Sequence, residues 1–120
     1  RLVTILCQHC KKEKKPTEIE SRLLDITFDS DEHRIFDAIG CIHCDNTGYK
    51  GRVAIIEALR INNELDEAIA KRATLGELKA TAKSTGYKTL AEDAIRCVLE
   101  GKTSITEVTR VIDLTQRLMV

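Results

Sequence analysis

The stretch 41–52 reads C-I-H-C-D-N-T-G-Y-K-G-R, and it decides the fold that we predict for this chain. Cys41 and Cys44 are separated by two residues, a spacing that lets one tight turn direct both sulfur atoms at a single ion. Gly48 follows, and glycine tolerates the left-handed backbone that such a turn requires. The apolar, β-branched run at 53–56 then predicts a short β-strand.

The same cysteine spacing occurs near the N-terminus, at Cys7 and Cys10. Two such pairs supply four thiolates, a complete ligand set for a closed tetrahedral zinc site that leaves no position for water. Such an ion would join two arms that are distant in sequence and stabilise a segment with a small core. The predicted zinc ligands are Cys7, Cys10, Cys41 and Cys44. The alternative is two reduced dithiols, or a disulfide formed in an oxidising preparation.

The roles of two histidines and of the fifth cysteine can also be predicted. His9 and His43 lie inside the two pairs and could replace a cysteine as ligand, but the simpler interpretation is that both are exposed. A redox role would need only one pair, so two matched pairs favour coordination. The fifth cysteine, Cys97, lies in an apolar helical pattern and is predicted to be a small buried residue.

Composition excludes several classes of protein. The chain has 120 residues, which fits one domain or two small subdomains, and its formal net charge is zero. A zero net charge argues against a general nucleic-acid binder, because neutralising phosphates requires a surplus of basic residues. The sequence has no long apolar run and no signal-peptide pattern, so we expect neither membrane insertion nor export. Five cysteines without an export signal favour a reducing compartment. The chain begins with Arg1 inside an apolar run, and we expect it to be part of a longer protein.

The two halves of the chain differ in their predicted secondary structure. Residues 1–6 and 53–59 are strand candidates, and a capping box at Thr17 begins a short helix. Helix signals in the second half begin near Asn62, Thr74, Thr89 and Ser104, and two of these helices end at a glycine. We therefore predict an α+β fold: a small zinc-bearing lobe with short strands at 1–60, followed by an all-helical subdomain of about four short helices at 61–120. Each part is expected to have its own core.

No catalytic site is predicted within these residues. Gly101-Lys102-Thr103 resembles the end of a phosphate-binding loop, but that loop needs a glycine where Arg96 stands. We interpret Gly101 as the end of a helix. The sequence contains no recognisable Ser-His-Asp set, carboxylate pair or glycine-rich phosphate loop.

Several motifs together resemble a known family over nearly the whole chain. They are L-C-x-x-C-K at 6–11, G-C-x-x-C-x-x-T-G-Y-K-G-R at 40–52, I-E-x-L at 56–59, L-x-x-D-A at 90–94 and G-x-T-S-x-x-E-V-x-R-V at 101–111. This pattern resembles the C-terminal part of the ATPases that drive bacterial type II secretion and type IV pilus assembly.

The resemblance implies a parent protein that is a hexameric, RecA-like P-loop ATPase. Its sites for ATP and magnesium would precede this chain, and residues 1–60 would include the end of its RecA-like sheet. Zinc would bind the four cysteines. The hexamer would be cytoplasmic and peripheral at the inner membrane. Its partners would be neighbouring subunits and the cytoplasmic domains of inner-membrane platform and recruiting proteins, and it would extrude pseudopilin or pilin subunits. The cysteine segment favours assembly or secretion over retraction.

Single positions can also be compared with the family pattern. Gly48, Gly51 and Arg52 match it, and Arg52 is either a structural ion-pair residue or an interface contact. The run 54–56 departs from the pattern, and the tail beyond Val111 is longer than is common in the family. The alternative function is a freestanding zinc module that binds protein or nucleic acid. The scarcity of aromatic residues argues against the nucleic-acid version.

Overall fold

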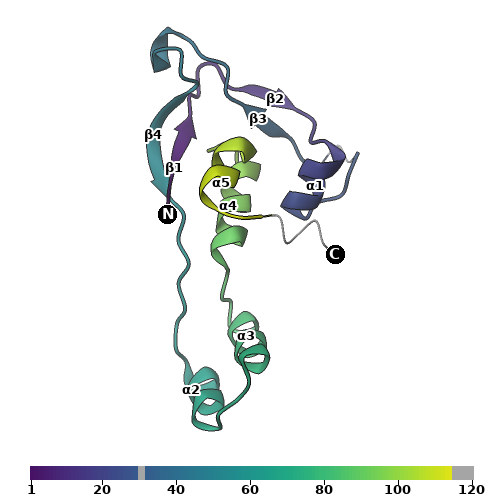
Figure 1. Ribbon diagram of the computed structural model, residues 1–120, viewed down its shortest axis with the longest axis vertical. Coiled ribbons are helices and arrows are strands. Elements are labelled where there is room, and N and C mark those ends of the chain that lie inside the picture. The colour runs from purple at the N-terminus through teal and green to yellow at the C-terminus, as the bar shows by residue number, and fades with distance from the viewer. Residues whose placement is uncertain (30–31, 115–120) are drawn as a thin grey trace. The chain divides into compact units, whose positions relative to one another are not determined.

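A computed structural model describes residues 1–29 and 32–114 (Figure 1). The elements, in chain order, are β1 (Leu2–Leu6), β2 (Lys12–Lys14), α1 (Glu18–Leu24), β3 (Ile35–Asp37), the 3-10 turn η1 (Ile42–Cys44), β4 (Tyr49–Ala54), α2 (Asn63–Ala70), α3 (Leu75–Ser84), α4 (Leu90–Leu99) and α5 (Ile105–Val111). The predicted α+β class is therefore confirmed. Among the described residues, none of the helices has the length and apolar character needed to span a bilayer.

The chain forms two compact units. The first unit combines residues 1–55 with the chain from residue 90 onward, and the second unit is 56–89. This division differs from the predicted boundary at residue 60. The expectation of a separate core for the second half is wrong for α4 and α5, because both helices pack into the core of the first unit. Helical periodicity in the sequence shows that a helix has an apolar face, but it does not identify what that face contacts.

The core of the first unit lies between two two-stranded antiparallel sheets and two helices. β1 pairs with β4, with Val3 opposite Val53, and β2 pairs with β3. α5 packs against β1, and α4 packs against β3 (Figure 1). The fully buried side chains of this core include Val3, Leu24, Ile35, Ile55, Ala94, Val98 and Val108. Two-stranded sheets are marginal alone, so this helix packing supplies much of the stability of the unit.

Hydrogen bonds tie β1 to the turn between α4 and α5. The Leu6 amide donates to the carbonyl of Lys102 at 2.8 Å. The buried hydroxyl of Thr103 donates to the carbonyl of Thr4, also at 2.8 Å. On the neighbouring strand, the Tyr49 hydroxyl lies 2.7 Å from the Ser104 hydroxyl. The segment after α4 thus occupies the outer edge of β1 and satisfies polar groups that would otherwise be unpaired.

Helix starts agree with the capping signals in the sequence. Thr17 and Glu20 form the complete capping box: the Thr17 hydroxyl accepts from the Glu20 amide, and the Glu20 carboxylate accepts from the Thr17 amide. Asn62, Thr74 and Ser104 also accept from the amide three residues later. Each such cap contributes about 1 kcal/mol, so the caps define where helices begin more than they drive folding.

The second unit has a small core. Within residues 56–89, all of which the structure describes, only Leu65 and Ala82 are buried. Large apolar side chains of the unit that remain half-exposed or more are Ile56, Leu59, Ile61, Ile69 and Leu75. α2 and α3 contact each other, and an isolated antiparallel bridge joins Ala58 to Lys88. Little apolar area is therefore removed from water in this unit.

We predict that α2 and α3 open more readily than α4. Because exchange of a protected amide requires local opening, the amides of α2 and α3 should exchange at least about tenfold faster than those of α4. Hydrogen–deuterium exchange followed by NMR on the metal-loaded chain measures both sets in one sample, so α4 serves as the internal control. Equal protection of the two sets would show that the second unit is as stable as the first.

Candidate metal centre

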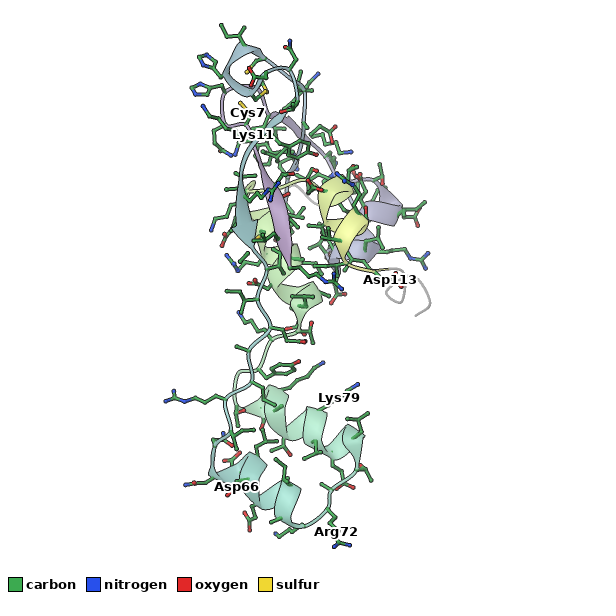
Figure 2. All side chains as sticks on the ribbon, turned by 60° about the vertical axis from the view of Figure 1, so that its left-hand side comes forward. Cys7, Lys11, Asp66, Arg72, Lys79 and Asp113 are labelled. Atoms are coloured by element: carbon green, nitrogen blue, oxygen red, sulfur yellow. The ribbon has the colours of Figure 1, made fainter. Side chains whose placement is uncertain are left out.

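Four cysteine sulfurs from two distant segments lie together at one end of the β1–β4 sheet. The Sγ atoms of Cys7, Cys10, Cys41 and Cys44 all lie within 4.8 Å of one another. Three of the separations, 7 to 41, 10 to 44 and 41 to 44, are each 3.8 Å. Figure 2 shows the sulfur atoms gathered beside the labelled Cys7. The structure thus brings together all four cysteines that the sequence analysis selected.

The sulfur spacing fits a tetrahedral zinc site. A regular tetrahedron with Zn–S distances of about 2.3 Å has S–S edges of about 3.8 Å. A disulfide would instead place two sulfurs about 2.05 Å apart, and all five cysteines of the chain are free thiols. The donor set is soft and all-thiolate, which suits zinc better than a hard cation such as magnesium. The residues present therefore fit the ion that the spacing of the cysteines predicts.

Two tight turns direct the cysteines inward. Cys7 follows β1 directly, and its carbonyl accepts from the amides of Cys10 and Lys11 at 3.4 and 3.0 Å. The carbonyl of Cys41 likewise accepts from the amides of Cys44 and Asn46 at 3.3 and 2.8 Å. Backbone hydrogen bonds therefore hold each Cys-x-x-Cys segment in a tight turn without the help of an ion.

Positive backbone angles complete the second turn. Asp45 and Asn46 have φ angles of 54° and 62°, the left-handed region that Asp and Asn tolerate better than most residues. Gly48 has a φ angle of 84°, and a Cβ at this position would lie 2.6 Å from the Cβ of Ala38. Glycine is therefore required here for two independent reasons, backbone conformation and close approach.

Backbone amides point at two of the sulfurs. The Gly40 amide donates to Cys10 Sγ at 3.3 Å. The amides of Cys41 and Gly48 donate to Cys44 Sγ at 3.3 and 3.2 Å. Four thiolates carry more negative charge than one divalent cation compensates. Amide donors of this kind stabilise the remaining negative charge.

Two thiols of the cluster have pKa values shifted in opposite directions. Burial opposes ionisation, but the amide donors from Cys41 and Gly48 outweigh it and hold the pKa of the Cys44 thiol at about 6. Burial and the neighbouring sulfurs of Cys10, Cys7 and Cys44 raise the pKa of the Cys41 thiol to about 11. Neighbouring thiolates repel one another, so all four groups lose their protons together only when a positive ion compensates the charge.

The two histidines lie outside the sulfur cluster. His9 and His43 are exposed, and their rings stack with centroids 4.1 Å apart. Among the described residues, the group able to hold a metal consists of the four cysteines alone. The interpretation of both histidines as exposed residues is confirmed. Their stacking is a contact between the two Cys-x-x-Cys segments that the sequence did not predict.

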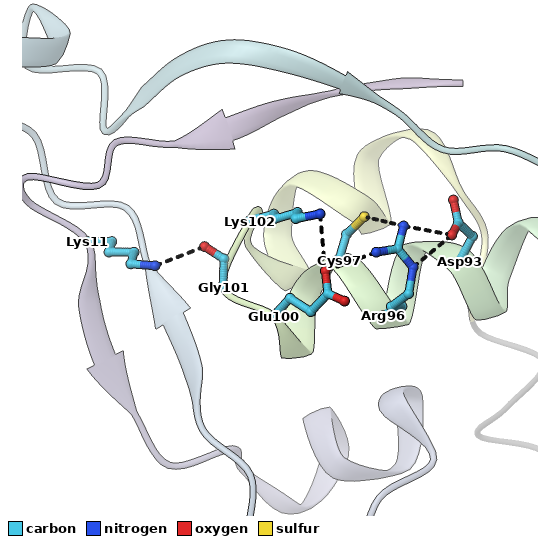
Figure 3. Close-up of polar contacts among 7 residues, drawn as sticks. All are labelled: Lys11, Asp93, Arg96, Cys97, Glu100, Gly101 and Lys102. Carbon is cyan, nitrogen blue, oxygen red and sulfur yellow. Dashed lines mark hydrogen bonds and ion pairs between the residues drawn. The ribbon is translucent and has the colours of Figure 1, made fainter.

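Lys11 joins the metal-binding segment to the end of α4, a link that sequence analysis missed. Its ammonium donates to the carbonyl of Gly101 at 3.2 Å (Figure 3) and lies 4.3 Å from the ring centre of Phe36. Gly101 ends α4 with a φ angle of 75°, as a helix stop should. The two partners are ninety residues apart in sequence, so no local pattern could have indicated this contact.

The neighbourhood of Cys97 is structural. Its side chain is fully buried on α4, as predicted, and burial raises the pKa of its thiol. On the exposed side of the helix, Arg96 pairs with Asp93 and Glu100, each at 2.9 Å (Figure 3). Pairs of this kind on an exposed helix surface contribute little to stability.

Comparison with known proteins identifies the family of this chain. A family model described as Type II/IV secretion system protein matches residues 1–110. The type IV pilus assembly ATPase PilB of Thermus thermophilus is 39% identical over 109 residues, which cover 90% of this chain and 12% of that protein. The type IV pilus assembly ATPase TfpB of Acinetobacter baylyi is 37% identical over 119 residues, or 96% of this chain and 20% of that protein.

The type II secretion system protein E of Aeromonas hydrophila is 34% identical over 112 residues, which cover 92% of this chain and 22% of that protein. The chain belongs to the Type II/IV secretion system protein family, and the resemblance stated from its motifs is confirmed. It spans only about an eighth to a fifth of the length of these curated relatives.

A substitution at Gly48 tests the close packing of the second turn. We expect Gly48→Ala to destabilise the first unit by about 2–4 kcal/mol, because it adds a steric clash to an unfavourable backbone angle. Gly51→Ala is the matched control: Gly51 has a similar φ angle of 87°, but its added Cβ meets only Ile5, at an ordinary 3.7 Å. Urea denaturation of the zinc-loaded variants, followed by NMR signals of β1, measures the difference. Equal losses in the two variants would show that the contact with Ala38 is unimportant.

Proposed function

We propose that this chain is the zinc-stabilised C-terminal domain of a hexameric ATPase that powers type II secretion or type IV pilus assembly. The observation that supports zinc most directly is the set of 3.8 Å sulfur separations, which equal the edges of a tetrahedral four-thiolate zinc site. Cys7, Cys10, Cys41 and Cys44 would hold the ion. A closed site of this kind supplies folding stability, not a reactive metal-bound water.

The parent protein would hydrolyse ATP with magnesium at a site outside this chain. The resemblance between Gly101-Lys102-Thr103 and a phosphate-binding loop gives no support to a site here, because the Thr103 hydroxyl is buried and donates to a backbone carbonyl. The relatives compared above are type IV pilus assembly ATPases and a type II secretion system protein, and this similarity supports the motor assignment.

The motor would be cytoplasmic and peripheral at the inner membrane, and would extrude pilin or pseudopilin subunits. Its partners would be the remainder of the ATPase, neighbouring subunits of the hexamer, and the cytoplasmic domains of inner-membrane platform and recruiting proteins. The alternative, a freestanding zinc module that binds protein or nucleic acid, is disfavoured by the family match over residues 1–110. A nucleic-acid role is further disfavoured by the zero net charge.

Zinc binding is tested by removing one ligand. We expect one zinc per purified chain, and we expect Cys41→Ser to lower zinc affinity at least about tenfold, because a tetrahedral site needs all four thiolates. Since α4 and α5 share the core of β1, loss of the ion should broaden the NMR signals of α4 together with those of β1. Metal analysis and competition with a zinc chelator provide the measurement.

The fifth cysteine provides the matched control for this experiment. Cys97→Ala removes a thiol that is buried on α4, outside the sulfur cluster, and should retain one zinc with unchanged affinity. A Cys41→Ser protein with the zinc content and affinity of the unaltered chain would exclude the proposed site.

The motor assignment makes a second prediction. The chain alone should hydrolyse no ATP above the buffer rate, because the proposed nucleotide site lies outside it. Phosphate release by the purified chain in the presence of ATP and magnesium measures this rate. Turnover that persists at constant specific activity through repeated purification would place a catalytic site inside the chain and contradict the proposal.

A further inference from the structure

A groove crosses the first unit between the β1–β4 sheet and α5. Two cavities of about 350 and 210 Å³ share the lining residues Thr4, Arg52, Glu107 and Arg110. We call this the Arg52 groove. It lies entirely within the first unit, and the four shared lining residues come from β1, β4 and α5.

One acidic group of the groove is already neutralised. Glu107 is 5% exposed, and its carboxylate accepts a hydrogen bond from the hydroxyl of Thr4 and another from Arg110, whose guanidinium nitrogen lies 3.1 Å away. A buried carboxylate needs such partners, so the charges of Glu107 and Arg110 compensate each other.

Arg52 has no such partner. It is exposed on β4, directly opposite Thr4 in the antiparallel register. Within residues 1–29 and 32–114, its guanidinium forms no hydrogen bond or ion pair. The sequence left two interpretations open for Arg52, and the structural ion pair is wrong for the described part of the chain. The groove therefore contains one guanidinium whose five donors are free for an external acceptor.

We propose that Arg52 binds the carboxylate of an aspartate or glutamate presented by a partner polypeptide. A planar guanidinium matches a carboxylate through two parallel hydrogen bonds, and the groove provides one uncompensated positive charge for one negative charge. A phosphate dianion fits less well, because Glu107 and Arg110 compensate each other and the groove then offers one positive charge, that of Arg52, for two negative charges.

Apolar residues beside the guanidinium favour a polypeptide as the source of the carboxylate. The smaller cavity is also lined by Leu2, which is 58% exposed, and by Val111 on α5. A peptide residue next to the acid can cover these side chains and remove them from water, which a free anion cannot do. This inference goes beyond the proposed function and does not depend on the metal.

Photo-crosslinking in the full-length protein tests the proposal. A benzophenone amino acid replaces Leu2, and the crosslinked partner peptide is mapped by mass spectrometry in the native host. We expect that peptide to contain an aspartate or glutamate near the crosslink. Arg52→Glu should lower the crosslink yield at least about tenfold, because it places two negative charges together. Changing the partner's acid to arginine in the Arg52→Glu background should restore the yield.

Lys50→Glu is the matched control, since Lys50 is an exposed cation on the same strand that lines neither cavity. Its yield should stay within about twofold of the unaltered protein. Arg52→Gln keeps most of the side chain and serves if Arg52→Glu fails to fold; it should also lower the yield several-fold. The proposal is overturned if no polypeptide is crosslinked, or if the adduct is a lipid or nucleic acid. It is also overturned if the Lys50 and Arg52 variants lose crosslink yield equally, or if the charge exchange does not restore the yield. Zinc content is measured on the same samples. A crosslinking result that contradicts the proposal while zinc is retained concerns the Arg52 groove and not the zinc site.

Discussion

The convergence of four sulfur atoms is the constraint on which the first unit depends. Two Cys-x-x-Cys turns, separated by a long segment that includes β2, α1 and β3, must meet within a few ångströms. Thiols alone would give little reason to do so, because ionised sulfurs repel and neutral ones attract weakly. A cation would convert this repulsion into attraction, and its binding free energy would offset the entropy lost when the intervening loop is closed. The amides that point at Cys10 and Cys44 show that the protein backbone is arranged for charged sulfur.

This constraint reaches the helices because the metal-binding turns contact the end of α4. Leu6 and Lys11, which flank the first cysteine pair, bond to the carbonyls of Lys102 and Gly101. The short segment between α4 and α5 therefore lies against both the strand and the turn that position the sulfurs. Two two-stranded sheets and two short helices would each be marginal alone, but together they share one buried core. The metal centre and α4–α5 are thus parts of one folding unit, whereas α2 and α3 are grouped separately.

The comparison between sequence and structure separates local signals from non-local ones. Thr17, Asn62 and Ser104 were identified as helix starts because a cap acts within three residues, and the cysteine pairs were identified because metal spacing is equally local. The assignment of α4 and α5 to the first unit could not be predicted this way. Their apolar stripes look like those of α2 and α3, and only the fold decides which stripe meets β1. The contact between Lys11 and Gly101 and the groove around Arg52 likewise join residues that are far apart in sequence.

Several chemically versatile groups of the first unit have structural partners. Four cysteines face one another, Cys97 is buried, and the hydroxyl of Thr103 is bonded to the backbone. Glu107 is a buried carboxylate, a group that can act as a base in other proteins, and here it accepts hydrogen bonds from Thr4 and Arg110. A group that is satisfied in this way stabilises geometry and is not poised to transfer a proton or attack a substrate. Arg52 differs, because its charge is exposed, lines a cavity and is uncompensated within the described residues. Arg52 is therefore the group of this unit that we propose for recognition of another polypeptide, and the four-cysteine cluster lies at one end of the β1–β4 pair that carries it.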